Sequence, residues 1–140
     1  MVSFEPSVLM FSGSKDGTTE KNIERTNCFG VNFIDSSLAS AAYKCIQWYG
    51  NERISKTGLS LTKAAKINAP LINECKAHLE CKLADTKEIG SGYVIFGEII
   101  AASIWEDILN ASPEERYKLL DQVVFLEDNL FSQINKVIKL

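Results

Sequence analysis

The amino-acid sequence predicts a mainly β domain that also contains helices, with its main strands paired antiparallel. Two long stretches, residues 77–87 and 93–103, have the composition of strands and are separated by Gly90-Ser91-Gly92, a turn sequence typical of hairpins. A shorter pair of strand-like stretches lies near the C-terminus. A chain of 140 residues has the usual length of one domain and can bury a core. We therefore expect a single α+β domain over residues 1–140.

The bulk composition narrows the possible partners. The chain is 46% hydrophobic and 24% charged, with a formal net charge of -3, which is ordinary for a globular protein. Because there is no basic stripe, we do not expect binding to nucleic acid. The longest apolar run, residues 93–104, is interrupted by Gly97 and Glu98 and is too short to span a bilayer. With no signal-peptide pattern at the N-terminus, we expect a soluble, cytoplasmic protein that does not bind membranes.

The N-terminal part predicts a strand, a loop, a helix and a second strand. The apolar residues 7–12 form the first strand, and residues 13–17 (GSKDG) interrupt it. A helical pattern begins at Thr18 and ends where Asn27 can adopt the left-handed conformation. Residues 28–34 (CFGVNFI) then form the second strand.

The next segment predicts a helix and a long connection. Asp35 or Ser36 can cap the helix. Its apolar residues recur at the spacing of one helical face, and they are Leu38, Ala41, Ala42, Cys45, Ile46 and Tyr49. Residues 50–70 lack a clear period and contain Gly58, so we expect a partly ordered surface connection there.

The central hairpin and the C-terminus follow different patterns. In the first central strand, Ala77, Leu79, Cys81 and Leu83 alternate with His78, Glu80 and Lys82, which places the polar set on an outer face. The second strand has no polar face and suits a position covered on both sides. Ser112-Pro113-Glu114-Glu115 is a capping box that starts a helix to about Leu120. Residues 123–126 and 130–138 form a final strand pair.

Signatures of common catalytic and metal sites are absent from the sequence. His78 is the only histidine, and the four cysteines include no C-x-x-C pair. A metal site built from Cys75, His78 and Cys81 is not expected, because strand alternation points His78 away from both cysteines. We expect His78 to be a polar strand residue and identify no catalytic residue.

The most suggestive polar cluster lies at the start of the first helix. Its members are Ser12, Ser14, Lys15, Thr18 and Thr19. Free backbone N–H groups and the helix dipole make such a place attractive to a phosphate. The alternative is that Asp16 or Thr18 simply caps the helix while the serines make turns, and the spacing alone favours this alternative.

Six short segments share their order and spacing with a known family. They are Val2-Ser3-Phe4-Glu5-Pro6, the loop with Ser12, Lys15, Thr19 and Ile23, Phe29-Gly30-Val31-Asn32, Glu52-Arg53-Ile54 with Gly58-Leu59, Ala69-Pro70 with Ala77-His78-Leu79-Glu80-Cys81, and Phe96-Gly97-Glu98-Ile99. Over residues 2–102 the chain resembles the flavin reductase-like domain family, which includes flavoredoxins and NAD(P)H:flavin oxidoreductases. The resemblance implies an antiparallel split β-barrel of the FMN-binding type.

The resemblance also implies a cofactor and its ligands. Similar proteins are homodimers that hold FMN non-covalently near the subunit interface. By this resemblance Ser12, Ser14, Lys15, Thr18 and Thr19 bind the flavin phosphate, and Phe11 and Asn32 approach the flavin. The isoalloxazine carries the redox chemistry, with NAD(P)H as a candidate electron donor and a redox protein or an oxygenase as a candidate partner.

Three departures from the family pattern bear on function. The resemblance starts at a strand inside the usual domain, so the family's opening strand pair, a source of flavin contacts, has no counterpart. Gly17 replaces an arginine common in the phosphate loop, and Gly90-Ser91-Gly92 replaces a G-D-H turn associated with nicotinamide use. Two alternatives to a flavin reductase therefore stay open: an FMN-binding electron carrier without NAD(P)H activity, and a shortened structural member that no longer binds flavin.

Overall fold

A computed structural model describes residues 1–48, 50, 52–134 and 136–138. Their contacts divide into two compact units. The first comprises Met1–Val31, Thr62–Leu71 and Leu79–Ala102, and the second comprises Asn32–Leu61, Ile72–His78 and Ser103–Leu140. Whether the chain behaves as a single domain in solution stays a prediction.

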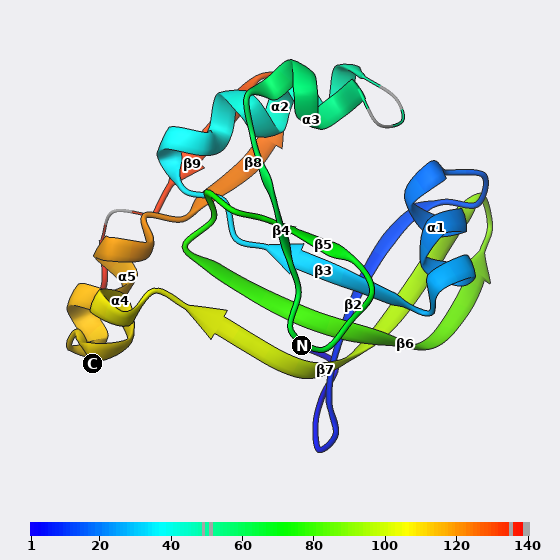
Figure 1. Ribbon diagram of the computed structural model, residues 1–140, viewed down its shortest axis with the longest axis horizontal. Helices are drawn as coiled ribbons and strands as arrows, with labels where there is room; N and C mark the ends of the chain where they lie inside the picture. The colour runs from blue at the N-terminus through cyan, green and yellow to red at the C-terminus, as the bar shows by residue number, and fades with distance from the viewer. Residues whose placement is uncertain (49, 51, 135, 139–140) are drawn as a thin grey trace. The chain divides into compact units, whose positions relative to one another are not determined.

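The first unit contains most of a five-stranded sheet (Figure 1). The strands are β1 (Ser3–Phe4), β2 (Ser7–Ser14), β3 (Cys28–Asn32), β6 (Ala77–Ile89) and β7 (Gly92–Ile104), and their order is β1-β2-β7-β6-β3. Strand β2 pairs antiparallel with both β1 and β7, as predicted for the main strands. The helix α1 (Thr18–Thr26) lies beside the end of β6 and β7 where the two strands turn (Figure 1).

The core of the first unit is a cluster of buried side chains from α1, β3, β6 and β7. Its buried members are Ile23, Phe29, Cys81, Tyr93 and Ile95. Because Ile23 comes from α1 and Phe29 from β3, this cluster fixes the helix against the sheet. The burial of these side chains therefore stabilises the packing of α1 in the first unit.

The second unit holds the remaining helices and a hairpin (Figure 1). Its elements are the short 3₁₀ helix η1 (Ser36–Leu38), α2 (Ala39–Gln47), α3 (Glu52–Thr57), α4 (Glu106–Asn110), α5 (Pro113–Leu120), and the antiparallel strands β8 (Val123–Glu127) and β9 (Leu130–Gln133). Two further short strands, β4 (Leu61–Lys63) and β5 (Pro70–Ile72), pair with each other, and most of their residues belong to the first unit. No helix in the described part of the chain is long and apolar enough to cross a membrane.

Several local predictions are confirmed. The helix α1 ends at Asn27, whose φ of 53° is left-handed. The carboxylate of Asp35 accepts hydrogen bonds from the backbone N–H groups of Ser37 and Leu38 and so caps η1. Ser112 forms the expected capping box at α5.

Other local predictions need correction. Residues 50–70 contain α3 and β4, and the helix α4 was not predicted. The strand expected over residues 28–34 ends at residue 32, and the one expected over 130–138 ends at residue 133. Tyr49 and residue 135 lie outside the described residues. The predicted outer face of β6 is wrong at His78 and Glu80, because both side chains are buried.

Candidate functional site

The loop between β2 and α1 is a tight turn that leads into an uncapped helix. Strand β2 ends at Ser14, and the backbone N–H of Gly17 donates to the carbonyl oxygen of Ser14 at 2.9 Å. Gly17 is the residue that precedes the helix, and no side chain caps it. The alternative in which Asp16 or Thr18 caps α1 is therefore wrong. The first N–H groups of the helix are left without a side-chain cap, which favours an anion at this end.

The five predicted phosphate ligands lie in the last residues of β2, in the turn and in the first residues of α1. Ser12, Ser14, Lys15, Thr18 and Thr19 are all exposed and belong to the first unit. Their four hydroxyl groups make no hydrogen bond with any other residue that the structure describes. Hydroxyl donors and an ammonium group beside a helix N-terminus are the groups that proteins use to bind phosphate.

Three carboxylates also lie at or near this turn. Glu88 of β6 accepts a hydrogen bond from the ammonium group of Lys15 at 2.8 Å, and this bond raises the pKa of Lys15 above its usual value. Asp16 lies 3.5 Å from the ammonium group of Lys21. Both ion pairs are well exposed, and exposed pairs of this kind stabilise proteins little. Lys15 can therefore exchange Glu88 for a ligand at small cost.

The third carboxylate, that of Glu20, fills the hollow of the turn. Glu20 is the third residue of α1, yet only 7% of it is exposed. A methyl group built on Gly13 would lie 1.6 Å from its Oε1, and one built on Gly17 would lie 1.8 Å from its Oε2. The two glycines thus leave room for one anionic group. The hollow fits the chemistry of a phosphate, but in this conformation the chain's own carboxylate occupies it.

The two residues predicted to approach the flavin lie in different surroundings. Phe11 belongs to the first unit, and its ring packs edge-on against Phe29 with 5.4 Å between the ring centres. Asn32 belongs to the second unit, where its side-chain oxygen accepts a hydrogen bond from the backbone N–H of Ile72 at 2.7 Å. Both residues thus have structural partners, and their contact with flavin stays a prediction.

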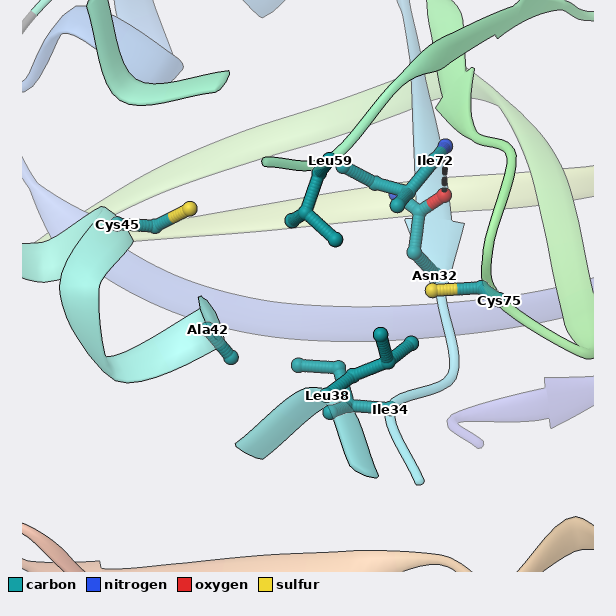
Figure 2. Close-up of a pocket in the computed structure, with 8 residues that line it drawn as sticks. All are labelled: Asn32, Ile34, Leu38, Ala42, Cys45, Leu59, Ile72 and Cys75. Carbon is teal, nitrogen blue, oxygen red and sulfur yellow. Dashed lines mark hydrogen bonds between the residues drawn. The ribbon is translucent and has the colours of Figure 1, made fainter. Parts of the chain in front are cut away.

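Sequence reasoning missed a cavity in the second unit, shown in Figure 2. Its volume is about 260 Å³, and it is lined by Asn32, Ile34, Leu38, Ala42, Cys45, Leu59, Ile72 and Cys75. Burial raises the pKa of the Cys75 thiol to about 11, so this thiol is neutral at physiological pH. The sequence held one signal of this cavity, the apolar face predicted for the helix that follows Asp35, because Leu38, Ala42 and Cys45 of that face line the cavity. An apolar cavity of this size suits a small apolar ligand.

The only histidine of the chain has a structural role. His78 is 8% exposed, its Nε2 lies 2.8 Å from the carbonyl oxygen of Ile72, and its Nδ1 lies 3.2 Å from the hydroxyl of Ser103. Both ring nitrogens are therefore engaged. Within the described ranges, no group of three or more His, Cys, Asp or Glu side chains could hold a metal ion.

The neighbouring Glu80 is also buried for a structural reason. Its carboxylate accepts hydrogen bonds from the backbone N–H groups of Ala65 and Lys66 at 2.9 and 2.6 Å. Burial raises the pKa of Glu80, but the backbone hydrogen bonds outweigh burial and hold the pKa below its usual value. Glu80 thus remains ionised and holds the loop that follows β4 against β6.

A partly buried ion pair organises the second unit. The ammonium group of Lys76 lies 2.9 Å from the carboxylate of Asp35 and donates to the carbonyl oxygen of Leu119 at 2.8 Å. Burial raises the pKa of Asp35. Hydrogen bonds from Ser37 and Lys76, together with the charge of Lys76, lower this pKa by more than burial raises it, so it lies below the usual value. This pair ties the start of η1 to the end of α5.

The chain is similar to known proteins in both sequence and fold. A family model described as "Flavin reductase like domain" matches residues 1–122. Nitrilotriacetate monooxygenase component B from Bacillus cereus has a TM-score of 0.89 at 16% identity, over 99% of this chain and 74% of that chain. A Shewanella frigidimarina protein described as having a split barrel domain has a TM-score of 0.86 at 18% identity, over 99% of this chain and 72% of that chain. Flavoredoxin from Methanosarcina acetivorans has a TM-score of 0.81 at 25% identity, over 99% of this chain and 75% of that chain.

These comparisons confirm the predicted fold class. The similarity to solved structures extends over nearly the whole chain, and one of them is described by its split barrel domain. The order of the six resembling segments in the sequence thus led to the correct architecture, an antiparallel split β-barrel with helices.

Proposed function

Because this chain belongs to the flavin reductase-like domain family, whose model matches residues 1–122, we propose that it is a flavoprotein that binds FMN non-covalently and passes electrons or hydride through it. The observation that carries the proposal is the segment from the end of β2 to the start of α1, where four hydroxyl groups without a hydrogen bond to other described residues and one ammonium group lie close in sequence to a helix N-terminus without a side-chain cap. When bound, the isoalloxazine would accept and donate the electrons.

The residues of the turn would bind and orient the phosphate. The hydroxyl groups of Ser12, Ser14, Thr18 and Thr19 would donate hydrogen bonds to it, and Lys15 would supply a positive charge. Phe11 and Asn32 are the residues proposed to approach the flavin ring. For Phe11 this requires that its ring keep one edge free while it packs against Phe29.

We further propose a cytoplasmic homodimer that works with a redox partner protein or an oxygenase. The four cysteines are free thiols, which fits a reducing compartment. The hairpin of β8 and β9 exposes Val124, Phe125, Leu126 and Leu130, each about half accessible, and exposed apolar patches are common at subunit interfaces. Component B of a monooxygenase is among the structurally similar proteins, which supports an oxygenase as one kind of partner.

The visible absorption spectrum of the purified protein tests flavin binding. The proposal predicts the absorption bands of oxidised flavin, released as FMN on denaturation. For protein purified without flavin, it predicts quenching of FMN fluorescence on titration. A colourless protein that leaves FMN fluorescence unchanged would refute the proposal and favour the alternative of a structural family member that has lost flavin.

A second candidate function is an electron carrier without NAD(P)H activity. It is favoured by the hairpin turn, where β6 ends at Ile89, β7 starts at Gly92, and only Gly90 and Ser91 lie between them. No histidine lies in this turn, and His78 is buried with both nitrogens engaged. Adding NADH to the FMN-loaded protein without oxygen separates the two functions. Bleaching of the flavin bands supports a reductase, and bands that persist with NADH but bleach with dithionite support a carrier.

A further inference from the structure

The carboxylate of Glu20 is placed where a bound anion would lie. It reaches back from the first turn of α1 and lies over Gly13, near the end of β2, and Gly17, the residue before α1. The side chain is more than nine-tenths buried, since only 7% of the residue is exposed. Glutamate side chains in the first turn of a polar helix are ordinarily exposed, so this burial calls for a cause.

Protein partners do not supply that cause. No hydrogen bond or ion pair joins the Glu20 carboxylate to any residue in the described ranges. The two nearest ammonium groups along the chain are engaged elsewhere, Lys15 with Glu88 and Lys21 with Asp16. What remains is the uncapped helix N-terminus, whose dipole stabilises a negative charge in the first turn. Glu20 therefore uses the same property of the helix that a phosphate would use.

We propose that Glu20 is an internal competitor of phosphate, which occupies the hollow of the turn and must move outward before a phosphate monoester binds there. The inference rests on the proposed function, because it concerns the same turn. Two negative groups cannot share a hollow that holds one carboxylate between two glycines. Glu20 thus weakens binding of the phosphate end of a ligand and leaves the binding of its uncharged part unchanged.

The test compares FMN with riboflavin, which lacks only the phosphate. The variant Glu20→Gln keeps the shape of the side chain and removes its charge. Glu20→Ala also empties the hollow. Glu24→Gln makes the same change of charge one turn further along α1, where the carboxylate accepts a hydrogen bond from the hydroxyl of Tyr93 and is not near Gly13 or Gly17, and is the control for charge. Dissociation constants come from quenching of flavin fluorescence at constant ionic strength, and urea unfolding checks that each variant is folded.

We expect Glu20→Gln to bind FMN about tenfold more tightly than the wild type, since charges near helix N-termini have effects of this order. The FMN affinity of Glu20→Ala should increase by at least the same factor. Riboflavin affinity should change less than twofold, and Glu24→Gln should resemble the wild type with both ligands. Equal FMN affinity in the wild type and both Glu20 variants would overturn the inference, as would an equal gain for FMN and riboflavin.

A second probe separates failure of the inference from failure of the proposed function. If no protein binds either flavin, the proposed function fails, and inorganic phosphate then tests the turn alone. Thermal unfolding in phosphate, compared with chloride of equal ionic strength, should show a larger stabilisation of Glu20→Gln than of the wild type. Equal stabilisation of the two would overturn the inference.

Discussion

Gly97 of β7 lies directly beneath the ring of Phe29, and this contact allows a sharp test of the core. A Cβ atom built on Gly97 would lie 2.3 Å from Cζ and 2.8 Å from Cε1 of Phe29, and 3.1 Å from Cβ of Cys81. Carbon atoms that are not bonded pack best at about 3.5–4.0 Å. In Gly97→Ala, the ring of Phe29 must therefore withdraw by roughly 1.2 Å or more.

The size of the effect follows from where the ring can go. Phe29 is 7% exposed and packs against Phe11, and Cys81, which the added methyl group would also approach, is fully buried. Because no neighbour is free to yield, we expect the free energy of unfolding to fall by about 2 kcal/mol, the usual cost of overpacking a core. For a domain of this size, the melting temperature should fall by roughly 8 °C.

Urea unfolding followed by circular dichroism measures this loss. Ala102→Val, at an exposed position of the same strand, is the control and should change the free energy of unfolding by less than about 0.5 kcal/mol. Phe29→Leu should lower the free energy of unfolding less in the Gly97→Ala background than in the wild type, because the smaller leucine side chain relieves the overlap with the added methyl group. A Gly97→Ala protein as stable as the wild type would refute the packing described for this core.

Three further predictions concern charge and thiol chemistry. Lys15→Gln should weaken FMN binding roughly tenfold, because a charge-assisted contact to phosphate is lost, and should leave riboflavin binding unchanged in the same fluorescence titration. Asp35→Asn should destabilise the protein at pH 7. The pKa of Asp35 is lowered in the folded state, so its stabilising contribution is present above the unfolded pKa of about 3.9 and is lost as the pH falls through the lower, folded value. The difference between wild type and Asp35→Asn in urea unfolding should therefore shrink at pH 3, and a constant difference would contradict this. Burial raises the pKa values of the Cys75 and Cys81 thiols to about 11, so at pH 8 only about one in a thousand is ionised. Brief alkylation followed by mass spectrometry should modify the more accessible Cys45 first, and early modification of Cys81 would contradict the burial.

Strong local signals made most of the fold predictable, and short elements escaped for lack of them. The capping box at Ser112 and the left-handed Asn27 are side-chain and backbone preferences that act within one turn. The helix α3 has six residues, and α4 has five and no capping side chain. Neither is long enough for an apolar period to repeat.

Burial of polar residues was the main failure, because it depends on segments far apart in the sequence. Alternation along β6 placed Glu80 on an outer face, but the loop at residues 65 and 66 covers it and donates to its carboxylate. Glu20 likewise belongs to a polar helix, and only the two glycines of the preceding turn allow its side chain to fold inward. The family resemblance, not residue type alone, pointed to the five candidate phosphate ligands, whose role stays a prediction, and the competing carboxylate emerged only from the structure.

A crystal structure of the protein soaked with FMN tests the central claim most directly. We predict that the phosphate lies in the turn before α1, within hydrogen-bond distance of Lys15 Nζ and of at least one hydroxyl of Thr18 or Thr19, which means about 2.7–3.2 Å. Glu20 should have turned away from Gly13 and Gly17. A phosphate held elsewhere, with Glu20 still in the hollow, would contradict the assignment of this turn as the cofactor site.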